Sequence, residues 1–400
     1  MDGGYLTQRS VSRKVSSTGG SVMLHIDSVL KPVEARIRQC RPSFSRHVVD
    51  EIEYVLRRGM LREGTCTLRF EDCFRKRTGA QYAYSVSNGT AALHLGLLCC
   101  IEPGCRVLVP GFSFIASASA VVHAGGVPVF VDVDPETFLL DIDDAWEKTD
   151  ESTGAIVPVH LFGNVVPYDG LLELAEEYDL RIVHDAAQAL GSTYMGAELG
   201  EFSDVSCYSF YPSKIITTGE GGMVTTYSEE LGHRVELLKN HGETEKYLHT
   251  LLGYNFRGNE VASVLGLDQM TRLDYFLEKR RSIARYYDLA IGNIEGVVPQ
   301  RVTEGTESCY NYYTVRVDPA MELDRDMIVM DMRNMNIETL VHYPFALTEQ
   351  PALRKYVTEP CQVAEELAKN VFSIPIHPYL TKREAEQVIL ALRTVVYRYL

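Results

Sequence analysis

The chain has 400 residues, enough for two or three domains of ordinary size. Lysine and arginine number 39 and aspartate and glutamate 54, a net charge of −15, which argues against nucleic-acid binding because phosphate recognition needs a concentrated basic face. Hydrophobic residues make up 46% of the chain and charged residues 23%, as in globular and not disordered proteins. No run reaches the ~18 uninterrupted apolar residues of a membrane span, so we expect a soluble protein without membrane contact.

The cysteines indicate a reducing compartment. There are nine of them, without a CxxC pair, and Cys99 and Cys100 are neighbours, which cannot readily form a relaxed disulfide. We therefore expect buried free thiols in a cytoplasmic protein and no metal site. The first 20 residues are rich in serine and glycine, with almost no acidic residues. We favour a partly disordered extension there over a transit peptide.

The elements expected along the chain indicate an α/β fold. Strands are predicted at residues 82–86, 107–109, 127–131, 155–159 and 181–184, with helices at 116–123 and 171–178 between them. Near-continuous Val, Ile and Leu runs separated by helices are typical of a buried parallel sheet. Farther along we predict a long helical region at 259–289, strands at 310–317 and 337–342, and helices at 325–335, 365–369 and 381–397.

This pattern predicts three parts. Residues 1–40 are the N-terminal extension. Residues 41–290 form a large domain with a mostly parallel central sheet. Residues 291–400 form a smaller C-terminal α+β domain, with a hinge near Gly292.

The first motif with candidate chemistry is SNGTAAL, residues 87–93. Small residues entering a helix, here Gly89 and Thr90, present free backbone N–H groups and the positive end of the helix dipole, which suits a phosphate. The alternative is a glycine turn in which Thr90 only caps its helix.

The second motif is HDAAQ, residues 184–188, at the end of a buried strand. Ligands of open parallel sheets bind beyond the carboxyl ends of strands, so Asp185 is a candidate site residue that needs a cationic partner. It could instead be a helix N-cap. Strand alternation points His184 away from Asp185.

The third motif ends the aromatic run SCYSFYPSK, residues 206–214, and is followed by the glycine-rich residues 217–222. An apolar site lowers the pKa of a lysine toward that of a nucleophilic amine, which makes Lys214 a candidate catalytic residue. The alternative is an ordinary surface lysine.

One cofactor needs all three groups. The phosphate of pyridoxal 5′-phosphate (PLP) suits a helix N-terminus, its ring nitrogen needs an acidic partner to stay protonated, and its aldehyde needs a lysine. The sequence therefore predicts a PLP site built from Gly89 and Thr90, Asp185, and Lys214.

These residues carry a specific resemblance. The chain resembles the DegT/DnrJ-type sugar aminotransferases, a branch of the fold-type I, aspartate aminotransferase-like PLP enzymes. Ordered matches run from about residue 41 to the C-terminus. They include residues 87–97, 109–132, 157–163 (VPVHLFG), 185–191, 208–224, 253–257 (GYNFR) and 374–380.

The resemblance implies roles for individual residues. Lys214 corresponds to the Schiff-base lysine and Asp185 to the partner of the pyridinium nitrogen. Gln188 corresponds to the glutamine near the cofactor's phenolic oxygen, and Phe114 to the aromatic residue that stacks on the ring. Gly89, Thr90 and Ser209 correspond to phosphate ligands. Asn255 corresponds to an asparagine that reaches the phosphate of the neighbouring subunit, so the resemblance implies a homodimer with shared active sites.

The chain also departs from the family pattern. His184 stands where relatives usually have glutamate. Arg62 replaces a small hydroxyl residue, and Asn311 and Thr348 replace histidines, all where substrate is expected to bind. The cofactor chemistry is thus better supported by the motifs than the identity of the substrate.

The implied reaction moves an amino group from glutamate or glutamine to a nucleotide-linked keto-deoxyhexose, through an internal aldimine at Lys214. His342, Tyr343 and Arg257 are candidate substrate contacts, although Arg257 fits an interface salt bridge equally well. His160 is a further candidate and equally fits a core histidine.

Three alternatives stay open. The acceptor could be a keto-cyclitol of the aminoglycoside type. The chain could be a sugar dehydratase on the same scaffold, but such relatives replace the lysine with histidine. A non-enzymatic sensor would show damage at Asp185, Gln188 or Lys214, and all three are intact.

Overall fold

The computed structural model describes residues 36–400, so most of the predicted N-terminal extension lies outside the described residues. The helices are α1 (His47–Arg58), α2 (Thr65–Thr78), α3 (Gly89–Cys100), α4 (Ile115–His123), α5 (Ile142–Lys148), α6 (Tyr168–Tyr178), α7 (Glu229–Lys239), α8 (Glu260–Met270), α9 (Leu273–Ile291), α10 (Arg325–Asn334), α11 (Gln362–Asn370) and α12 (Lys382–Tyr399). Within this part of the chain no helix combines the length and apolarity that a membrane span needs.

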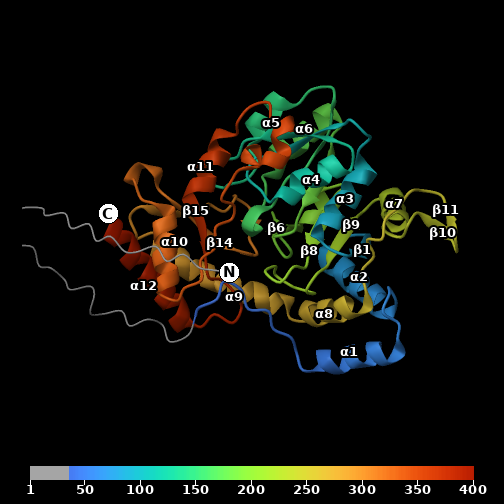
Figure 1. Cartoon of the computed structure of the whole chain (residues 1–400), viewed down its shortest axis with the longest axis horizontal. Helices are drawn as coiled ribbons and strands as arrows, with labels where there is room; N and C mark the ends of the chain where they lie inside the picture. Colours follow the sequence, from blue (N-terminus) through green and yellow to red (C-terminus); the bar gives the residue numbers. More distant parts are fainter. Residues whose placement is uncertain (1–35) are drawn as a thin grey trace, which may run out of the picture.

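A mostly parallel sheet of seven strands organises the larger part of the molecule. Its strands are β1 (Tyr82–Val86), β2 (Arg106–Pro110), β3 (Val127–Val131), β4 (Thr153–Ile156), β5 (Arg181–Asp185), β8 (Val205–Ser209) and β9 (Gly222–Thr226). The order is β1-β9-β8-β5-β4-β2-β3, and β9 alone runs opposite to the other six strands. Helices lie around this sheet (Figure 1), which confirms the predicted α/β fold.

The parallel strands bring distant segments to one edge of the sheet. The strands β5 and β8 pair in parallel, with Asp185 opposite Cys207, so both chains leave the sheet side by side. The loop after β1 leads into α3, whose first turn is fixed by Asn88: its side chain accepts a hydrogen bond from the N–H of Ala91 at 2.8 Å. The residues after β1, β2, β5 and β8 therefore meet at the carboxyl edge, where ligands of such sheets bind.

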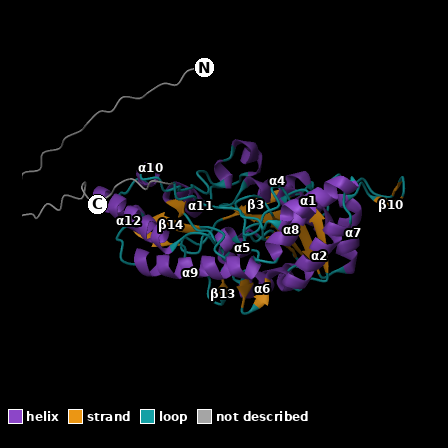
Figure 2. Cartoon of the chain, turned by 90° about the horizontal axis from the view of Figure 1, so that it is seen from below, coloured by secondary structure: helices purple, strands orange, loops and turns teal. Residues whose placement is uncertain are grey.

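A small antiparallel sheet forms a second core. It pairs β12 (Val297–Pro299), β14 (Tyr313–Val317) and β15 (Val371–Ile374), and α10 and α12 pack with it. Figures 1 and 2 both show α9 running lengthwise between these C-terminal elements and the large sheet. The remaining short strands are β6 (Thr193–Tyr194), β7 (Ala197–Glu198), β10 (Glu243–Glu245), β11 (Leu248–His249) and β13 (Thr306–Glu307).

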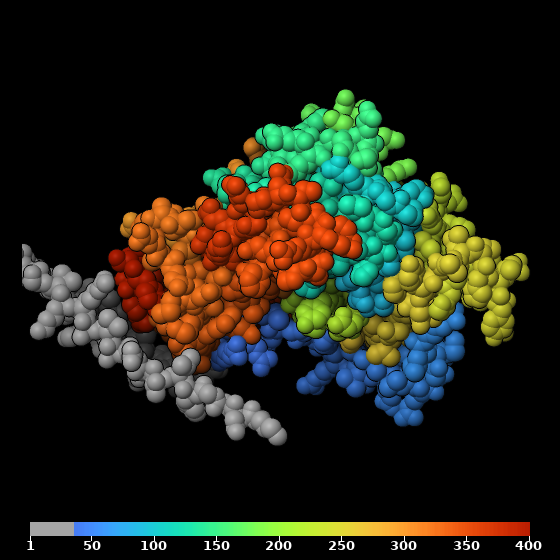
Figure 3. All heavy atoms as spheres, turned by 45° about the horizontal axis from the view of Figure 1, so that its top comes forward, coloured from blue at the N-terminus to red at the C-terminus, as the bar shows by residue number. Residues whose placement is uncertain are grey.

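Two segments pack in the core that lies farther away in the sequence. Ile37 is buried in the small core and pairs with Ile337. In the other direction, residues 346–371 contribute side chains to the core of the large sheet. The N–H groups of Val363 and Ala364 both donate to the carboxylate of Asp132, at 3.0 and 2.9 Å. Figure 3 shows this orange-red segment lying against the large part of the molecule.

Three expected elements differ from the structure. The long helical region expected at 259–289 consists of two helices, α8 and α9, because the chain turns at Thr271 and Arg272. The strand expected at 337–342 is absent, since Ile337 and Leu340 make only isolated bridges with two different segments. The strand expected at 155–159 is observed as Thr153–Ile156; beyond it Pro158 has no N–H to donate, and Val159 makes only an isolated bridge with Asp185.

Candidate active site

A cavity of about 420 Å³ lies at the carboxyl edge of the parallel strands, within the size range of small-molecule sites. The sequence-predicted residues that line it are Gly89, Thr90, Phe114, Asp185, Gln188, Ser209, Lys214, His342 and Tyr343. The structure thus brings together segments spread over more than 250 residues of the chain. Three predicted residues, His160, Asn255 and Arg257, do not line it.

The first turn of α3 forms one end of the cavity. The first N–H groups of a helix have no partner within it, so those of Gly89 and Thr90 are available to an anion. Gly89 approaches β8 so closely that a Cβ built on it would lie 2.7 Å from the Cβ of Ser209. Only glycine fits there without displacing Ser209.

Asp185 supplies a buried carboxylate. Its Oδ2 accepts a hydrogen bond from Ser117 at 2.8 Å, and its Oδ1 accepts one from the N–H of Ala187 at 3.2 Å. Burial raises the pKa of Asp185, while Ser117, Ala187 and the nearby Lys214 oppose that rise. A cation bound in the cavity would further favour the ionised carboxylate of Asp185.

Lys214 lies in the turn after β8, where its N–H donates to the carbonyl of Tyr211 at 2.9 Å. Burial lowers the pKa of Lys214 to about 8, against the opposing effect of Asp185. An amine with such a pKa is partly neutral near pH 7, so it can act as nucleophile and as base.

Another part of the cavity wall is formed by Gln188, Phe114 and Tyr343. The Oε1 of Gln188 accepts from the N–H of Phe162 at 2.8 Å, and its Nε2 donates to the hydroxyl of Tyr343 at 3.1 Å. The ring of Tyr343 lies 5.8 Å from that of Phe114, which is 53% exposed and so free to cover a flat ligand.

His342 and Tyr312 line the cavity near Lys214. Burial, and then the positive charge of Lys214, lower the pKa of His342 to about 4, so its ring is neutral near pH 7. Its Nδ1 is buried without a hydrogen-bond partner among the described residues. The hydroxyl of Tyr312 donates to Ser213 at 2.6 Å, which ties β14 to the segment that carries Lys214.

Sequence reasoning missed several of these residues. Ser117, the partner of Asp185, lies in the small-residue run of α4 and gave no signal of its own. Tyr211, Ser213 and Glu220 belong to motifs that were recognised but were assigned no role. Tyr312 is one of several aromatic residues in its strand, and only the fold shows which of them faces the cavity.

Three predicted positions lie elsewhere. His160 is fully buried, 4.6 Å in ring distance from His184, and its Nδ1 accepts from the N–H of Val166; this is the core histidine of the alternative interpretation. Arg257 donates to the side chain of Asn240 at 2.7 Å. Asn255 is exposed on the surface of its own chain.

The three departures in the expected substrate region also lie outside the cavity lining. Asn311 is buried, Arg62 is exposed, and the hydroxyl of Thr348 donates to Glu365 at 2.9 Å. Within this chain none of them contacts the space beside Lys214.

Comparisons with known proteins identify the chemistry. Residues 43–393 match the profile of the DegT/DnrJ/EryC1/StrS aminotransferase family. The chain is 34% identical to a GDP-perosamine synthase of Caulobacter vibrioides over 83% of this chain and 91% of that protein. It is 32% identical to a UDP-2-acetamido-2-deoxy-3-oxo-D-glucuronate aminotransferase of Pseudomonas aeruginosa, over 85% and 94% of the two chains.

A solved structure extends the similarity to the fold and cofactor. A protein of Streptococcus pneumoniae described as a sugar aminotransferase has a TM-score of 0.86 and 28% identity, covering 91% of this chain and 100% of its own. It has been solved in a PLP form and a PMP form.

The residues of the cavity fit this cofactor. The first turn of α3 beside Ser209 would hold the phosphate, Asp185 the ring nitrogen, Lys214 the aldehyde, and Phe114 one face of the ring. Burial raises the pKa of Asp185, and a protonated ring nitrogen beside it would oppose that rise and keep the carboxylate ionised. The chain is a PLP-dependent aminotransferase and belongs to the DegT/DnrJ/EryC1/StrS aminotransferase family.

Proposed function

We propose that this enzyme transfers an amino group from glutamate or glutamine to the keto group of a nucleotide-linked keto-deoxyhexose. The observation that carries the proposal is the meeting of Lys214 and Asp185 in one cavity of about 420 Å³. The names of the relatives supply the acceptor class, because the proteins from Caulobacter and Pseudomonas are both named for nucleotide sugars.

The reaction needs one proton carrier and one fixed negative charge. Bound PLP supplies a ring that delocalises negative charge from the substrate carbon. Asp185 holds the proton on the ring nitrogen, and its hydrogen bond from Ser117 favours the ionised carboxylate that this requires. Lys214, with a pKa of about 8, would take a proton from the substrate carbon and deliver it to the C4′ carbon of the cofactor.

His342 and Tyr343 are the substrate contacts that we propose from this chain, since both line the cavity. The hydrogen bond from Gln188 fixes the hydroxyl of Tyr343. We leave His160 out because its buried ring does not reach the cavity.

We further propose a homodimer with shared active sites, in a reducing, cytoplasmic compartment. Asn255 is exposed and outside its own cavity, as a residue that serves the neighbouring subunit would be. The nine cysteines are all free thiols, which supports the compartment.

The acceptor is tested with a panel of nucleotide keto-deoxyhexoses and keto-cyclitols, each incubated with holoenzyme and ¹⁵N-glutamate or amide-labelled ¹⁵N-glutamine. The proposal expects ¹⁵N in a nucleotide amino sugar. Label in a keto-cyclitol alone would favour the aminoglycoside alternative, and a deoxygenated sugar without label would favour a dehydratase. The matched control is Lys214→Ala, which should transfer no label.

The shared site is tested by subunit complementation. Lys214→Ala and Asn255→Ala proteins are co-expressed with different affinity tags, and the mixed dimer is isolated. If Asn255 serves the partner's site, one of the two sites in the mixed dimer is intact, and activity exceeds that of either variant alone. No gain in an isolated mixed dimer would contradict sharing.

A further inference from the structure

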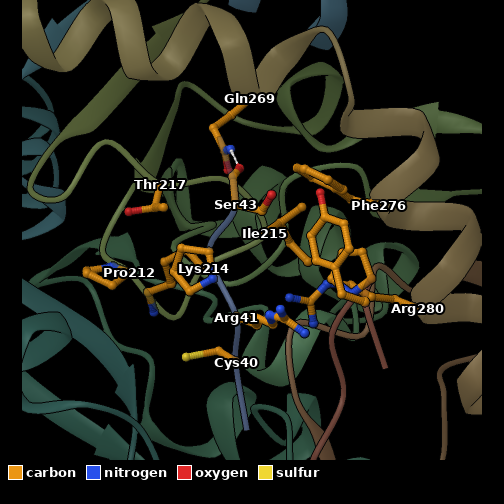
Figure 4. Close-up of a pocket in the computed structure, with 13 residues that line it drawn as sticks. Cys40, Arg41, Ser43, Pro212, Lys214, Ile215, Thr217, Gln269, Phe276 and Arg280 are labelled. Carbon is orange, nitrogen blue, oxygen red and sulfur yellow. Dashed lines mark hydrogen bonds between the residues drawn. The ribbon is translucent and has the colours of Figure 1, made fainter. Parts of the chain in front are cut away.

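A second, much smaller cavity lies beside the Lys214 segment. It is enclosed by residues 40–43, the 212–217 loop, Gln269 of α8, Phe276 and Arg280 of α9, and residues 378–379 (Figure 4). Its volume is about 20 Å³, enough for one or two water-sized particles. The cavity therefore joins four parts of the chain that are distant in sequence, around a space too small for an organic substrate.

Arg280 brings a buried positive charge to this cavity. Its side chain is only 3% exposed, and its Nη1 donates to the carbonyl oxygens of Tyr310, Asn311 and Ile376 at 3.0–3.2 Å. Its Nε is buried without a partner among the described residues. Burial lowers the pKa of Arg280 to about 10, but the guanidinium stays charged at neutral pH.

No carboxylate within the described chain offsets that charge. The titratable groups that oppose the lowering of the Arg280 pKa are the thiols of Cys40 and Cys309 and the phenol of Tyr312. Burial raises the pKa of each of these groups, so all three are neutral near pH 7. A buried charge without a counter-ion is costly, and Arg280 thus lacks the partner that such a residue normally has.

A second guanidinium borders the same space. Arg41 lines the cavity together with Arg280 (Figure 4), and among the described residues no acidic side chain lines it. Glu384 is the carboxylate on which Arg41 acts, but it does not line the cavity and already accepts hydrogen bonds from the N–H and hydroxyl of Thr381.

We propose that this cavity binds one monatomic halide anion, chloride under cellular conditions, between Arg280 and Arg41. The donors are guanidinium N–H groups, which favour an anion, and a space of about 20 Å³ suits a monatomic anion better than phosphate or sulfate. The bound anion offsets the charge of Arg280 and holds residues 40–43 and α9 against the loop that carries Lys214. Lys214 lines both this cavity and the cofactor cavity, so the two sites adjoin, but the anion site does not depend on the identity of the sugar substrate.

The direct test is diffraction from holoenzyme crystals soaked in sodium bromide, with data collected at the bromine absorption edge. The expected result is an anomalous peak in the cavity, in contact with the guanidinium of Arg280. Bromide peaks at surface sites with none in this cavity would overturn the proposal.

A solution test uses the melting temperature of the holoenzyme in sodium chloride and in sodium gluconate at equal ionic strength. Wild type should melt higher in chloride, because the anion binds only the folded state. Arg41→Gln should need roughly tenfold more chloride for the same rise, since it loses one charge-assisted donor. Arg285→Gln, on the exposed face of α9, is the charge-matched control and should behave as wild type. The same chloride response in all three proteins would overturn the proposal.

Discussion

Replacing His160 with glutamine tests whether this histidine belongs to the core or to the substrate site. Its ring is fully buried, and burial lowers the pKa of His160 to about 3 from its ordinary value of 6.5. Below pH 6.5 the His160 ring takes up a proton in the unfolded chain but not in the folded chain. Its contribution to the free energy of unfolding is therefore full above that pH and is lost as the pH falls. The loss from this one group approaches about 1.4 kcal/mol for each pH unit between 6.5 and 3.

The assay is urea unfolding of the cofactor-free protein from pH 7 to pH 4.5, followed by circular dichroism at fixed protein concentration. His160→Gln can still accept the hydrogen bond from Val166, and it removes the titrating group. Between pH 6.5 and 4.5 the free energy of unfolding of the variant should therefore fall by about 2–3 kcal/mol less than that of wild type. His233→Gln, which changes an exposed histidine on α7, is the control and should follow wild type. Equal pH dependence of all three proteins would refute the assignment of His160 to the core.

Three further substitutions probe the cofactor site. Gly89→Ala should lower the melting temperature and weaken PLP binding, because its Cβ would lie 2.7 Å from that of Ser209; Gly200→Ala, whose Cβ meets its nearest atom at 3.7 Å, should do neither. Ser117→Ala should weaken PLP binding in fluorescence titration by roughly tenfold, because the Asp185 carboxylate loses its 2.8 Å hydrogen bond; unchanged binding would contradict that role. Asp185→Asn should lower the rate of the glutamate half-reaction by roughly a hundredfold or more in stopped-flow absorbance, and a rate near wild type would show that the carboxylate is dispensable.

Much of the large domain could be predicted from local pattern. Buried parallel strands are continuous apolar runs, so β2, β3 and β5 were visible in the sequence, and the ends of β5 and β8 located Asp185 and Lys214. The contacts of the C-terminal residues with the large core could not be predicted from the sequence. Residues 346–371 return to the large core through Asp132, a contact across more than 200 residues that no local periodicity encodes.

The residues of the candidate site also fall into those that the sequence predicted and those that only the fold shows. Residues in motifs that enter or leave strands were found, because their chemistry needs that position. Ser117 was missed because its role depends on α4 packing beside the end of β5, which is a property of the fold. His160 lies in a motif near the site, and only the packing of its ring against His184 and Tyr168 separates a core residue from a substrate contact.

The central claim is that the amine of Lys214 carries the vitamin B6 aldehyde in the cavity that it shares with Asp185. Borohydride reduction of the holoenzyme, followed by proteolysis and mass spectrometry of the peptides, measures this directly. We expect a pyridoxyl group on Lys214 and on no other lysine, and none in the Lys214→Ala protein. A label on a different lysine, or a wild-type protein that takes up the cofactor and is not labelled, would contradict the account.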